Sequence, residues 1–388
     1  MRGLLQKLAW RTYHFVHSNG LAADIVYRVA FHLQRLLRGI RYRSIARSAV
    51  TPEELWSHRQ FGLAGGLITG VTNICNAKCS FCAYPKVVAN KTLETGIMSF
   101  AVFQKAVDEW ARLGGTQLNL TPVVGDPLVD SGLLDKLDYA VKKGIRVIMT
   151  TNGILLDKND NYRQLIDRGI REVYISAQGT SKVMYEQIFG VNRFDESMSG
   201  IRHLLEYNRS RGEPIKIGIR FRNAEKPSEI IRSPEFQKYL KPYFSEKVRV
   251  NFTVDFDNWG GTIKAEDLRG NMRLRQLPKQ LNVPCTALFG VAIRHDGGVR
   301  LCGCRLVRND MDDLVVGNIR ESTITELAEG EQAWNIIKGF YSGQRPETCR
   351  ACTFYTPVSR AWLKSRALAK ARLLARPQPA GPRVLAKQ

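Results

Sequence analysis

Between residues 64 and 256, short apolar runs alternate with helical stretches, and this alternation limits the possible folds more than any other feature of the chain. Repeated strand–helix units predict a parallel β-sheet. Six such units form either a partial barrel or an open doubly wound sheet. The six strand candidates are Leu67–Val71, Gln117–Leu120, Val147–Thr151, Val173–Ala177, Ile215–Arg220 and Val248–Val254.

The helix candidates lie between these strands. Ser99 is placed as an N-cap before the first of them. The segments are Ala101–Leu113, Leu133–Lys143, Tyr162–Arg168, Ser197–Arg211 and Pro227–Tyr239. We expect four regions: a basic amphipathic helical extension (1–60), an α/β barrel core (61–265), a small cysteine-rich α+β domain (266–356), and a basic helix at Pro357–Ala375 followed by a disordered tail (357–388 in all).

Composition narrows the class of protein. The 388 residues are 44% hydrophobic and 24% charged, which is typical of a soluble globular protein. No apolar run is long enough to span a bilayer, and the N-terminus lacks the pattern of a signal peptide. The eight cysteines lie at short spacings in two groups, which favours metal sites over disulfides. We therefore expect a cytoplasmic protein.

The first cysteine group directly follows the first predicted strand. Cys75, Cys79 and Cys82 lie within eight residues, and no fourth cysteine is near them. Ligands bind at the carboxyl ends of parallel strands. Three thiolates can hold one face of an iron–sulfur cube and leave one iron open, whereas a ferredoxin cluster takes four ligands. A zinc site with a remote fourth ligand is the alternative.

Three cysteines at this spacing, with Phe81 just before the third, resemble the signature of the radical S-adenosylmethionine (radical SAM) superfamily. The resemblance implies a partial (β/α)6 barrel and a [4Fe–4S] cluster whose open iron binds S-adenosylmethionine (SAM). It also implies reductive cleavage of SAM to a 5′-deoxyadenosyl radical, which takes a hydrogen atom from the substrate. The protein then supplies orientation and a dry pocket.

Further matches follow the later strands. Residues 124–127 resemble the family's Gly-Gly-Glu-Pro segment, with Val124 for the first glycine and Asp126 for the glutamate, and residues 150–153 resemble its Thr-Asn-Gly turn. Each segment is also an ordinary turn. The resemblance implies cofactor contacts at Phe81, Gly125, Asp126, Pro127, Asn152, Ser176, Gln178 and Arg220, with Arg222 as an alternative to Arg220. Asp255, Asp257 and Trp259 follow the sixth strand as candidates for substrate contacts.

The second cysteine group resembles the SPASM/twitch extension of radical SAM enzymes. The resemblance implies one auxiliary [4Fe–4S] cluster on Cys285, Cys302, Cys349 and Cys352, with structural zinc as the alternative. Cys304 is left over. In the family a spare cysteine can donate a hydrogen atom to a substrate radical, which gives epimerisation. Its other interpretations are an inert buried thiol or a ligand that exchanges with Cys302.

Charge is unevenly distributed. The formal net charge is +22, and residues 1–50 carry nine Lys/Arg against the single acid Asp24. Such a basic helical segment lies either on an anionic membrane surface or against the barrel with a solvated face. The chain has no recognisable nucleic-acid-binding module, so a nucleic-acid partner is disfavoured.

We therefore expect oxidation or epimerisation of a small polar substrate, such as a sugar or aminocyclitol, with lipid-linked forms included. The electron donor would be a flavodoxin or ferredoxin. The alternatives are the maturation of a ribosomally made peptide and a non-catalytic zinc/cysteine binding protein. Residues 1–60 do not resemble a winged-helix leader-peptide binder, which disfavours the peptide alternative.

Overall fold

The computed structural model describes most of the chain. Its residues are 2–47, 49–57, 66–89, 94–177, 181–222, 224–279, 281–303 and 313–366. Cys304 and Gln178 lie outside these ranges, as do most of the predicted C-terminal basic helix and the tail. Residues 360–366, at the start of that predicted helix, are helical.

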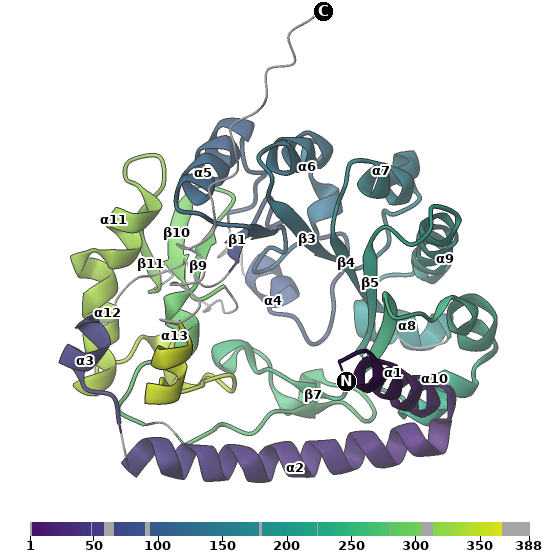
Figure 1. Cartoon of the computed structure of the whole chain (residues 1–388), viewed down its shortest axis with the longest axis horizontal. Helices are drawn as coiled ribbons and strands as arrows, with labels where there is room; N and C mark the ends of the chain where they lie inside the picture. Colours follow the sequence, from purple (N-terminus) through teal and green to yellow (C-terminus); the bar gives the residue numbers. More distant parts are fainter. Residues whose placement is uncertain are drawn as a thin grey trace, which may run out of the picture.

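The described residues form a nine-stranded sheet in the order β11-β10-β9-β1-β2-β3-β4-β5-β6. Strands β1 to β6 are parallel and correspond to the six predicted strands. Their bounds are β1 Leu67–Thr69, β2 Gln117–Asn119, β3 Arg146–Thr151, β4 Glu172–Ala177, β5 Lys216–Arg222 and β6 Val248–Thr253. The sheet curves with helices along its outside (Figure 1), so it is the partial barrel rather than the doubly wound sheet.

The helices around the barrel follow the predicted order. The bounds are α4 Tyr84–Ala89, α5 Phe100–Arg112, α6 Leu133–Lys142, α7 Asn161–Asp167, α8 Lys182–Phe189, α9 Phe194–Ser210 and α10 Pro227–Arg232. The Ser99 hydroxyl accepts a hydrogen bond from the Val102 amide, which confirms the predicted N-cap of α5. The single helix predicted at Pro227–Tyr239 is wrong. The chain leaves the helix at Ser233 because the following proline disfavours helical backbone there, and a separate π-turn covers Phe236–Leu240.

The two faces of the curved sheet differ in polarity. On β4, Val173 and Ile175 are fully buried beneath the outer helices, whereas Tyr174 and Ser176 alternate with them and are only half-buried. Ser176 lies opposite Arg220 of β5 in the register. The inner face of the barrel is therefore lined with polar and basic side chains, as a ligand site requires.

The cysteine-rich region continues the same sheet. Its strand β9 (Val291–Ile293) pairs in parallel with β1, and β10 (Gly298–Leu301) and β11 (Val315–Asn318) follow in antiparallel order. A separate pair joins β7 (Asp255–Phe256) to β8 (Arg273–Leu274). The helices of this region are α11 Ile324–Glu329, α12 Glu331–Tyr341 and α13 Glu347–Arg350.

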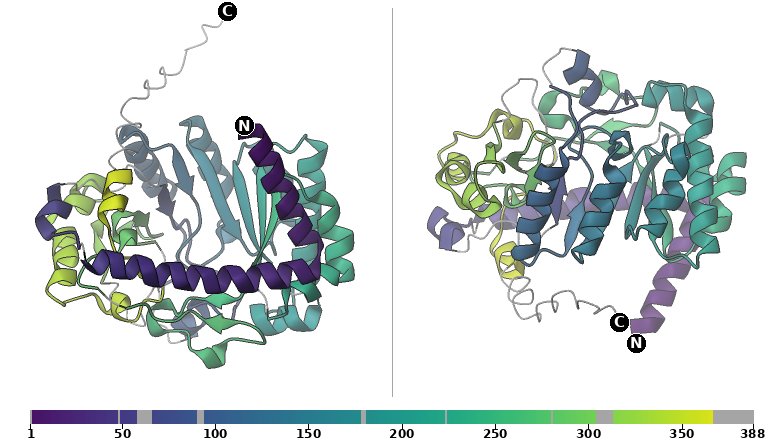
Figure 2. Two further views of the ribbon diagram at one scale, coloured as in Figure 1. Left: turned by 60° about the horizontal axis from the view of Figure 1, so that its bottom comes forward. Right: turned by 90° about the horizontal axis from the view of Figure 1, so that it is seen from above.

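The N-terminal extension is helical, as predicted, and spans the open side of the barrel. Its helices are α1 Arg2–Ser18, α2 Gly20–Arg47 and α3 Pro52–Ser57. Helix α2 runs across from the β6 edge to the cysteine-rich region (Figures 1 and 2). Within the described residues, no helix has both the length and the apolar character needed to cross a membrane.

Three tyrosines fasten this extension. The Tyr13 hydroxyl donates to the Val250 carbonyl at 2.8 Å and accepts from the Val250 amide, and the Tyr27 hydroxyl accepts from the Phe252 amide. Near the other end of α2, the Tyr42 hydroxyl donates to the Tyr355 carbonyl. The first two hydroxyls satisfy backbone groups on the outer edge of β6, which would otherwise be a template for pairing.

Candidate active site

The three predicted ligand cysteines lie in the loop that follows β1, at the carboxyl end of the sheet. Two backbone hydrogen bonds fix the loop against the end of α8: the Lys78 amide donates to the Phe189 carbonyl at 2.7 Å, and the Ser80 amide donates to the Ile188 carbonyl at 2.8 Å. The Cys82 amide donates to the Cys79 carbonyl. The loop is therefore held in place by the fold before any ligand binds.

Burial dominates the electrostatics of these thiols. It raises the pKa of Cys75 to about 12 and that of Cys82 to about 11, and it raises the pKa of Cys79 well above its usual value. Without a metal the three groups are neutral thiols. A metal centre deprotonates them as it binds, because coordination outweighs the cost of burying the charge.

Arg222 at the end of β5 supplies positive charge beside this loop. Its guanidinium lies 5.7 Å from the centre of the Phe81 ring, and the nearby Arg222 charge lowers the pKa values of Cys79 and Cys82 against the larger effect of burial. Its Nε atom is buried and has no hydrogen-bond partner among the described residues. A buried cation with an unused donor fits an anionic group at this position, such as a cluster or a ligand carboxylate.

Arg220 lies one layer deeper in the barrel than Arg222. Its guanidinium stacks on the Tyr174 ring at 4.0 Å. Of the two arginines that the sequence left open, Arg222 is therefore the one beside the cysteine loop.

The Gly125–Pro127 turn packs directly on the cysteine loop. The Asp126 amide donates to the Ile74 carbonyl at 2.9 Å. Gly125 has a φ of +114°, and a Cβ there would come within 2.9 Å of the Asn73 carbonyl carbon. Only glycine permits this approach.

The Asp126 carboxylate is occupied within the fold. It accepts hydrogen bonds from the Thr151 hydroxyl and from the amides of Asn152 and Leu128. It thereby joins the end of β2 to the end of β3. The geometry gives this carboxylate a positioning role and does not favour the direct contact with a ligand amino group that the resemblance implied.

Asn152 contacts the cysteine loop itself. Its side-chain amide donates to the Asn76 side-chain oxygen at 2.6 Å and lies 3.9 Å from the Cys75 sulfur. Asn73 anchors the loop from the other side, because its amide donates to the Glu94 carbonyl and its oxygen accepts from the Gly96 amide. Sequence reasoning missed Asn73 and Asn76, although both lie within the Thr72–Cys79 stretch where any side-chain amide is a candidate to brace the loop.

The structure gathers the second cysteine set around one cavity. Cys285, Cys302, Cys349 and Cys352 line a space of about 210 Å³ with mainly apolar walls. Burial raises the pKa of Cys285 to about 12 and also raises that of Cys349. The Thr356 amide donates to the Cys285 sulfur. These residues are separated by up to 67 positions in the sequence, and only the fold brings them together.

The four thiols form a donor set that suits an iron–sulfur cluster. A [4Fe–4S] cluster binds each of four thiolates through a different iron. Structural zinc also accepts four thiolates. The four cysteines around this mainly apolar cavity therefore fit a cluster.

Two family models match the chain. The radical SAM superfamily model matches residues 69–232, and an iron–sulfur cluster-binding domain of the SPASM type matches residues 285–353. Together the two models cover more than half of the chain. The protein belongs to the radical SAM superfamily.

Individual relatives are distant. A GTP 3′,8-cyclase from Vibrio vulnificus (strain YJ016) is 26% identical over 42% of this chain and 46% of its own length. An AdoMet-dependent heme synthase from Oleidesulfovibrio alaskensis is 28% identical over 34% of this chain and 33% of its own length. The chain thus spans less than half the length of these curated relatives.

Two solved structures align with this chain at low sequence identity. BtrN in complex with AdoMet and 2-DOIA is 17% identical with a TM-score of 0.46, covering 76% of this chain and 93% of that one. Native anSMEcpe with bound AdoMet is 16% identical with a TM-score of 0.48, covering 79% of this chain and 97% of that one.

The family match identifies the cofactors that the two cysteine sets bind. This radical SAM protein holds a [4Fe–4S] cluster on Cys75, Cys79 and Cys82, binds SAM, and carries an auxiliary cluster on SPASM-domain cysteines. The buried cation of Arg222 and the dry four-cysteine cavity fit these groups. The bound cofactors supply radical chemistry, and the chain holds and shields them.

The remaining predicted residues lie on the segment after β6. The Trp259 indole donates to the Phe81 carbonyl at 2.9 Å, within the first cysteine loop. The neighbouring Asn258 amide donates at 2.7 Å to the Ala351 carbonyl, which lies between Cys349 and Cys352. Two adjacent residues thus connect both cysteine loops. Sequence reasoning missed Asn258.

The two aspartates of this segment have partners within the fold. Asp257 accepts from the Thr353 hydroxyl at 2.8 Å, and Asp255 pairs with Arg275 at 3.0 Å. Asp257 therefore fastens the barrel to the cysteine-rich region. Asp255 is only partly buried and remains close to the barrel mouth.

Proposed function

We propose that the protein cleaves SAM reductively and oxidises or epimerises a small polar substrate, such as a sugar or aminocyclitol, by abstracting a hydrogen atom from it. The connection of both cysteine loops through Asn258 and Trp259 carries this proposal. It supports a substrate position between two clusters, one of which starts the reaction while the other accepts an electron or closes the domain over the barrel mouth.

Within the proposed site, residues at strand ends hold the SAM ligand. Arg222 supplies a buried cation for its carboxylate, and Asn152 positions the loop that carries Cys75. Gly125 and Pro127 offer backbone groups of the turn that packs on that loop. Ser176 and Arg220 line the inner face for the ribose and the substrate.

The first test counts iron and product. After anaerobic reconstitution we expect about eight irons per chain, from two four-iron clusters. Chemical reduction with SAM present should yield 5′-deoxyadenosine. Cys75→Ala should lower the iron content to about four and abolish that product. Zinc in place of iron, or a native rate of 5′-deoxyadenosine formation from Cys75→Ala, would refute the assignment.

Deuterated water separates the two reaction types. Epimerisation through Cys304 would place solvent deuterium in the product, and Cys304→Ala would stop turnover after hydrogen abstraction. Oxidation would give a product two hydrogens lighter without deuterium. A modified peptide as the natural product, identified by mass, would favour maturation of a ribosomal peptide instead.

The net charge bears on the choice of electron donor. A formal net charge of +22 attracts an acidic redox protein, so we propose a flavodoxin or ferredoxin as the donor in the cytoplasm. Measuring 5′-deoxyadenosine formation against ionic strength tests this, because screening should slow the reaction with a protein donor and leave reduction by dithionite much less affected.

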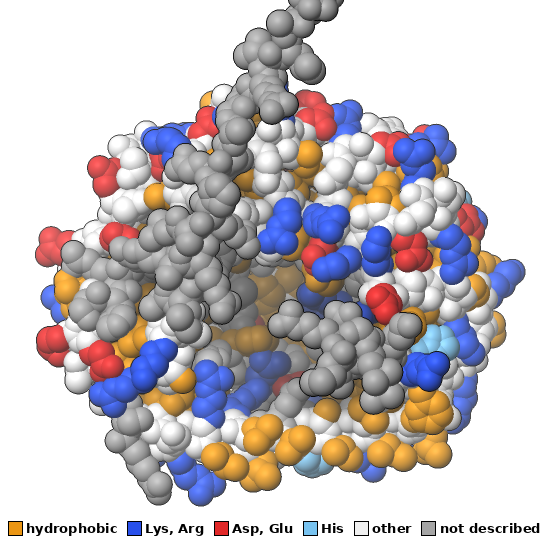
Figure 3. All heavy atoms as spheres, viewed as in Figure 1, with side chains coloured by type: hydrophobic (Ala, Val, Ile, Leu, Met, Phe, Trp, Pro, Cys, Tyr) orange, Lys and Arg blue, Asp and Glu red, His pale blue; other side chains and the backbone are white. Residues whose placement is uncertain are grey.

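Helix α2 supports a position at the membrane surface. Large apolar side chains recur along its outward face, and Figure 3 shows a row of hydrophobic side chains at the lower edge. The exposed fraction of each exceeds 40%: Leu21, Ile25, Val26, Val29, Leu33, Leu36, Leu37 and Ile40. Nine Lys/Arg and one acid in residues 1–50 complement anionic lipid headgroups. We therefore propose peripheral binding to an anionic membrane.

A further inference from the structure

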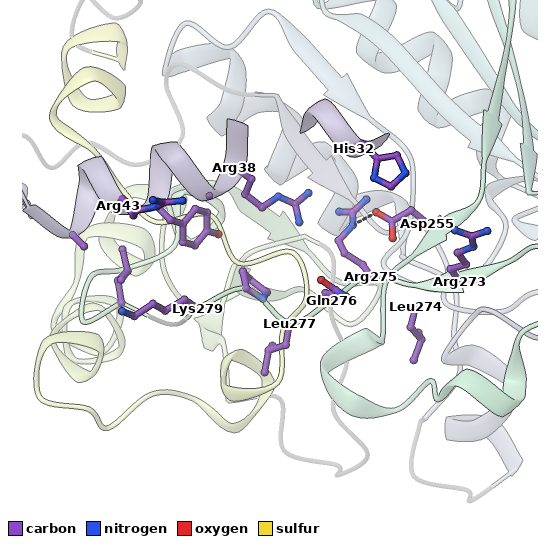
Figure 4. A pocket seen from close by; sticks show the side chains of 15 residues that line it. His32, Arg38, Arg43, Asp255, Arg273, Leu274, Arg275, Gln276, Leu277 and Lys279 are labelled. Atoms are coloured by element: carbon purple, nitrogen blue, oxygen red, sulfur yellow. Dashed lines mark hydrogen bonds and ion pairs between the residues drawn. The ribbon is translucent and has the colours of Figure 1, made fainter. Parts of the chain in front are cut away.

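A cavity of about 580 Å³ lies between α2 and the segment that runs from β8 toward Cys285. Arg38 and Arg43 enter it from the helix, and Arg273, Arg275 and Lys279 enter it from the facing segment (Figure 4). Two smaller hollows beside α2 share wall residues with it. We refer to these three hollows beside α2 together as the groove.

The groove has more positive charge than its own acids can neutralise. Asp255 pairs with Arg275, which accounts for one cation. Within the described part of the chain, Arg38, Arg273 and Lys279 form no ion pair. Clustered arginines with free guanidinium forks are suited to a phosphate group.

Gly39 leaves an opening into this groove. It lies inside the long helix α2, where alanine would be more favourable, and a Cβ added there would meet no atom within 4 Å. Neither backbone conformation nor packing requires a glycine at this position. Gly39 lines the groove, and Leu36, Leu37 and Ile40 beside it on the same helix are exposed.

We propose that this groove binds the phosphate-bearing headgroup of an anionic membrane lipid, and that the hydrocarbon chain of that lipid lies along the exposed apolar face of α2. Arg38 and Arg273 would contact the phosphate, and the gap at Gly39 would let the chain leave toward the bilayer. The exposed apolar side chains, Arg38 and the gap at Gly39 lie on the same helix, and Arg273 faces them from β8.

The groove also lies close to the cysteine loop. The β7–β8 pair forms the wall between them: Asp255 and Arg273 line the groove, while the next residue, Phe256, contacts the Phe81 ring at 5.2 Å between ring centres. A lipid held by its phosphate here would keep its polar group beside the barrel mouth. The substrate class we infer is a lipid-linked polar headgroup, and this part of the inference rests on the proposed function.

Vesicle sedimentation with the reconstituted full-length protein tests the membrane face. Phosphatidylcholine vesicles containing phosphatidylglycerol should bind at least about tenfold more tightly than phosphatidylcholine alone. Leu33→Glu should weaken that binding about tenfold. Phe100→Glu is the matched control, because Phe100 is a similarly exposed residue on α5 at the opposite side of the molecule, and it should bind as the wild type does.

Titration calorimetry with a short-chain phosphatidic acid, kept below its micelle concentration, tests the groove without a bilayer. Arg38→Gln and Arg273→Gln should each weaken binding about tenfold. Arg232→Gln removes the same charge from an exposed position of α10 that does not line the groove, and it should have no effect. Gly39→Leu should block binding by filling the gap, whereas Gly39→Ala should retain it.

Several results would overturn the inference. These are wild-type affinity in Arg38→Gln and Gly39→Leu, equal affinity for inorganic phosphate and for the lipid, and a lipid-free dimer that Leu33→Glu converts to monomers. Binding of RNA in preference to vesicles would also overturn it. Iron content at the wild-type level verifies that each variant is folded. The proposed function is tested by a separate assay: it fails if the wild-type protein forms no 5′-deoxyadenosine from SAM.

Discussion

Helices α2 and α5 are both amphipathic, but they present their apolar sides in opposite directions. In α5, Val102, Phe103, Val107 and Trp110 are buried against the sheet. In α2, the apolar stripe at Leu21, Ile25, Val29 and Leu33 faces outward, and the inner side is held by tyrosine hydroxyls and small residues such as Ala23.

The comparison separates two uses of the same sequence period. A helical repeat of apolar residues shows that one face avoids water, and it does not identify the partner that covers that face. The stripe of α5 is covered by the protein's own core. The stripe of α2 has no cover within the described residues, so its burial depends on an external surface.

The largest expected difference comes from placing a charge on each stripe. Phe103→Glu should prevent folding or lower the free energy of unfolding by at least about 4 kcal/mol, because Phe103 is fully buried. Leu33→Glu should change it by less than about 0.5 kcal/mol, because Leu33 is half exposed. Urea denaturation measures both. Equal losses would mean that the α2 stripe is packed within the protein.

Two glycines extend the comparison to the backbone. Gly125→Ala should cost about 2–3 kcal/mol, because it combines a positive φ with a clash against Asn73. It should also deplete iron at the three-cysteine site. Gly39→Ala should stabilise the protein by about 1 kcal/mol, since helix α2 has open space there. Thermal melting together with iron analysis verifies both, and a stable, iron-replete Gly125→Ala protein would contradict the close approach.

The attachment of the N-terminal extension to β6 should depend on its tyrosines. Tyr13→Phe removes two hydrogen bonds to Val250 on the β6 edge and should cost about 1–2 kcal/mol. Amide hydrogen exchange at β6 should accelerate. Tyr139→Phe is a suitable control, because its hydroxyl bonds Asp108 far from that edge. Unchanged exchange at β6 would show that the extension does not protect the edge.

The smallest effect concerns the ion pair in the groove. Asp255→Asn should change the free energy of unfolding by less than about 1 kcal/mol, since the pair with Arg275 is partly solvated. It should nevertheless tighten binding of short-chain phosphatidic acid, because the Arg275 guanidinium becomes available. Calorimetry and urea denaturation give the two values, and weaker lipid binding would contradict the phosphate site.

Much of the fold could be predicted because its signals are local. The six strands have apolar runs of the length that a buried parallel strand needs. The Ser99 cap and the three-cysteine loop each depend on residues that are close together in the sequence. The prediction of one helix through residue 239 was wrong. It relied on the helical spacing of apolar residues and ignored the proline after Ser233, where the helix ends. That proline is itself a local signal and could have been used.

The contacts inside the site could not be predicted, since they join separate strand ends. Asp126 resembled a ligand-binding carboxylate, yet three donors from Thr151, Asn152 and Leu128 occupy it. No sequence motif includes Asn258, although its side-chain amide donates a hydrogen bond to the second cysteine loop. Each of these roles depends on which loops the sheet brings together.

By itself, the sequence determined the six-stranded parallel sheet and the two cysteine sets, because strand period and ligand spacing are properties of short segments. Only the tertiary structure decided that Arg222 lies beside the first set, that residues 258–259 connect both sets, and that the apolar stripe of α2 faces outward. The physical reason is that burial and proximity depend on packing between distant segments. The spacing of apolar residues along a helix is the same whether its apolar face points to the core or to the outside.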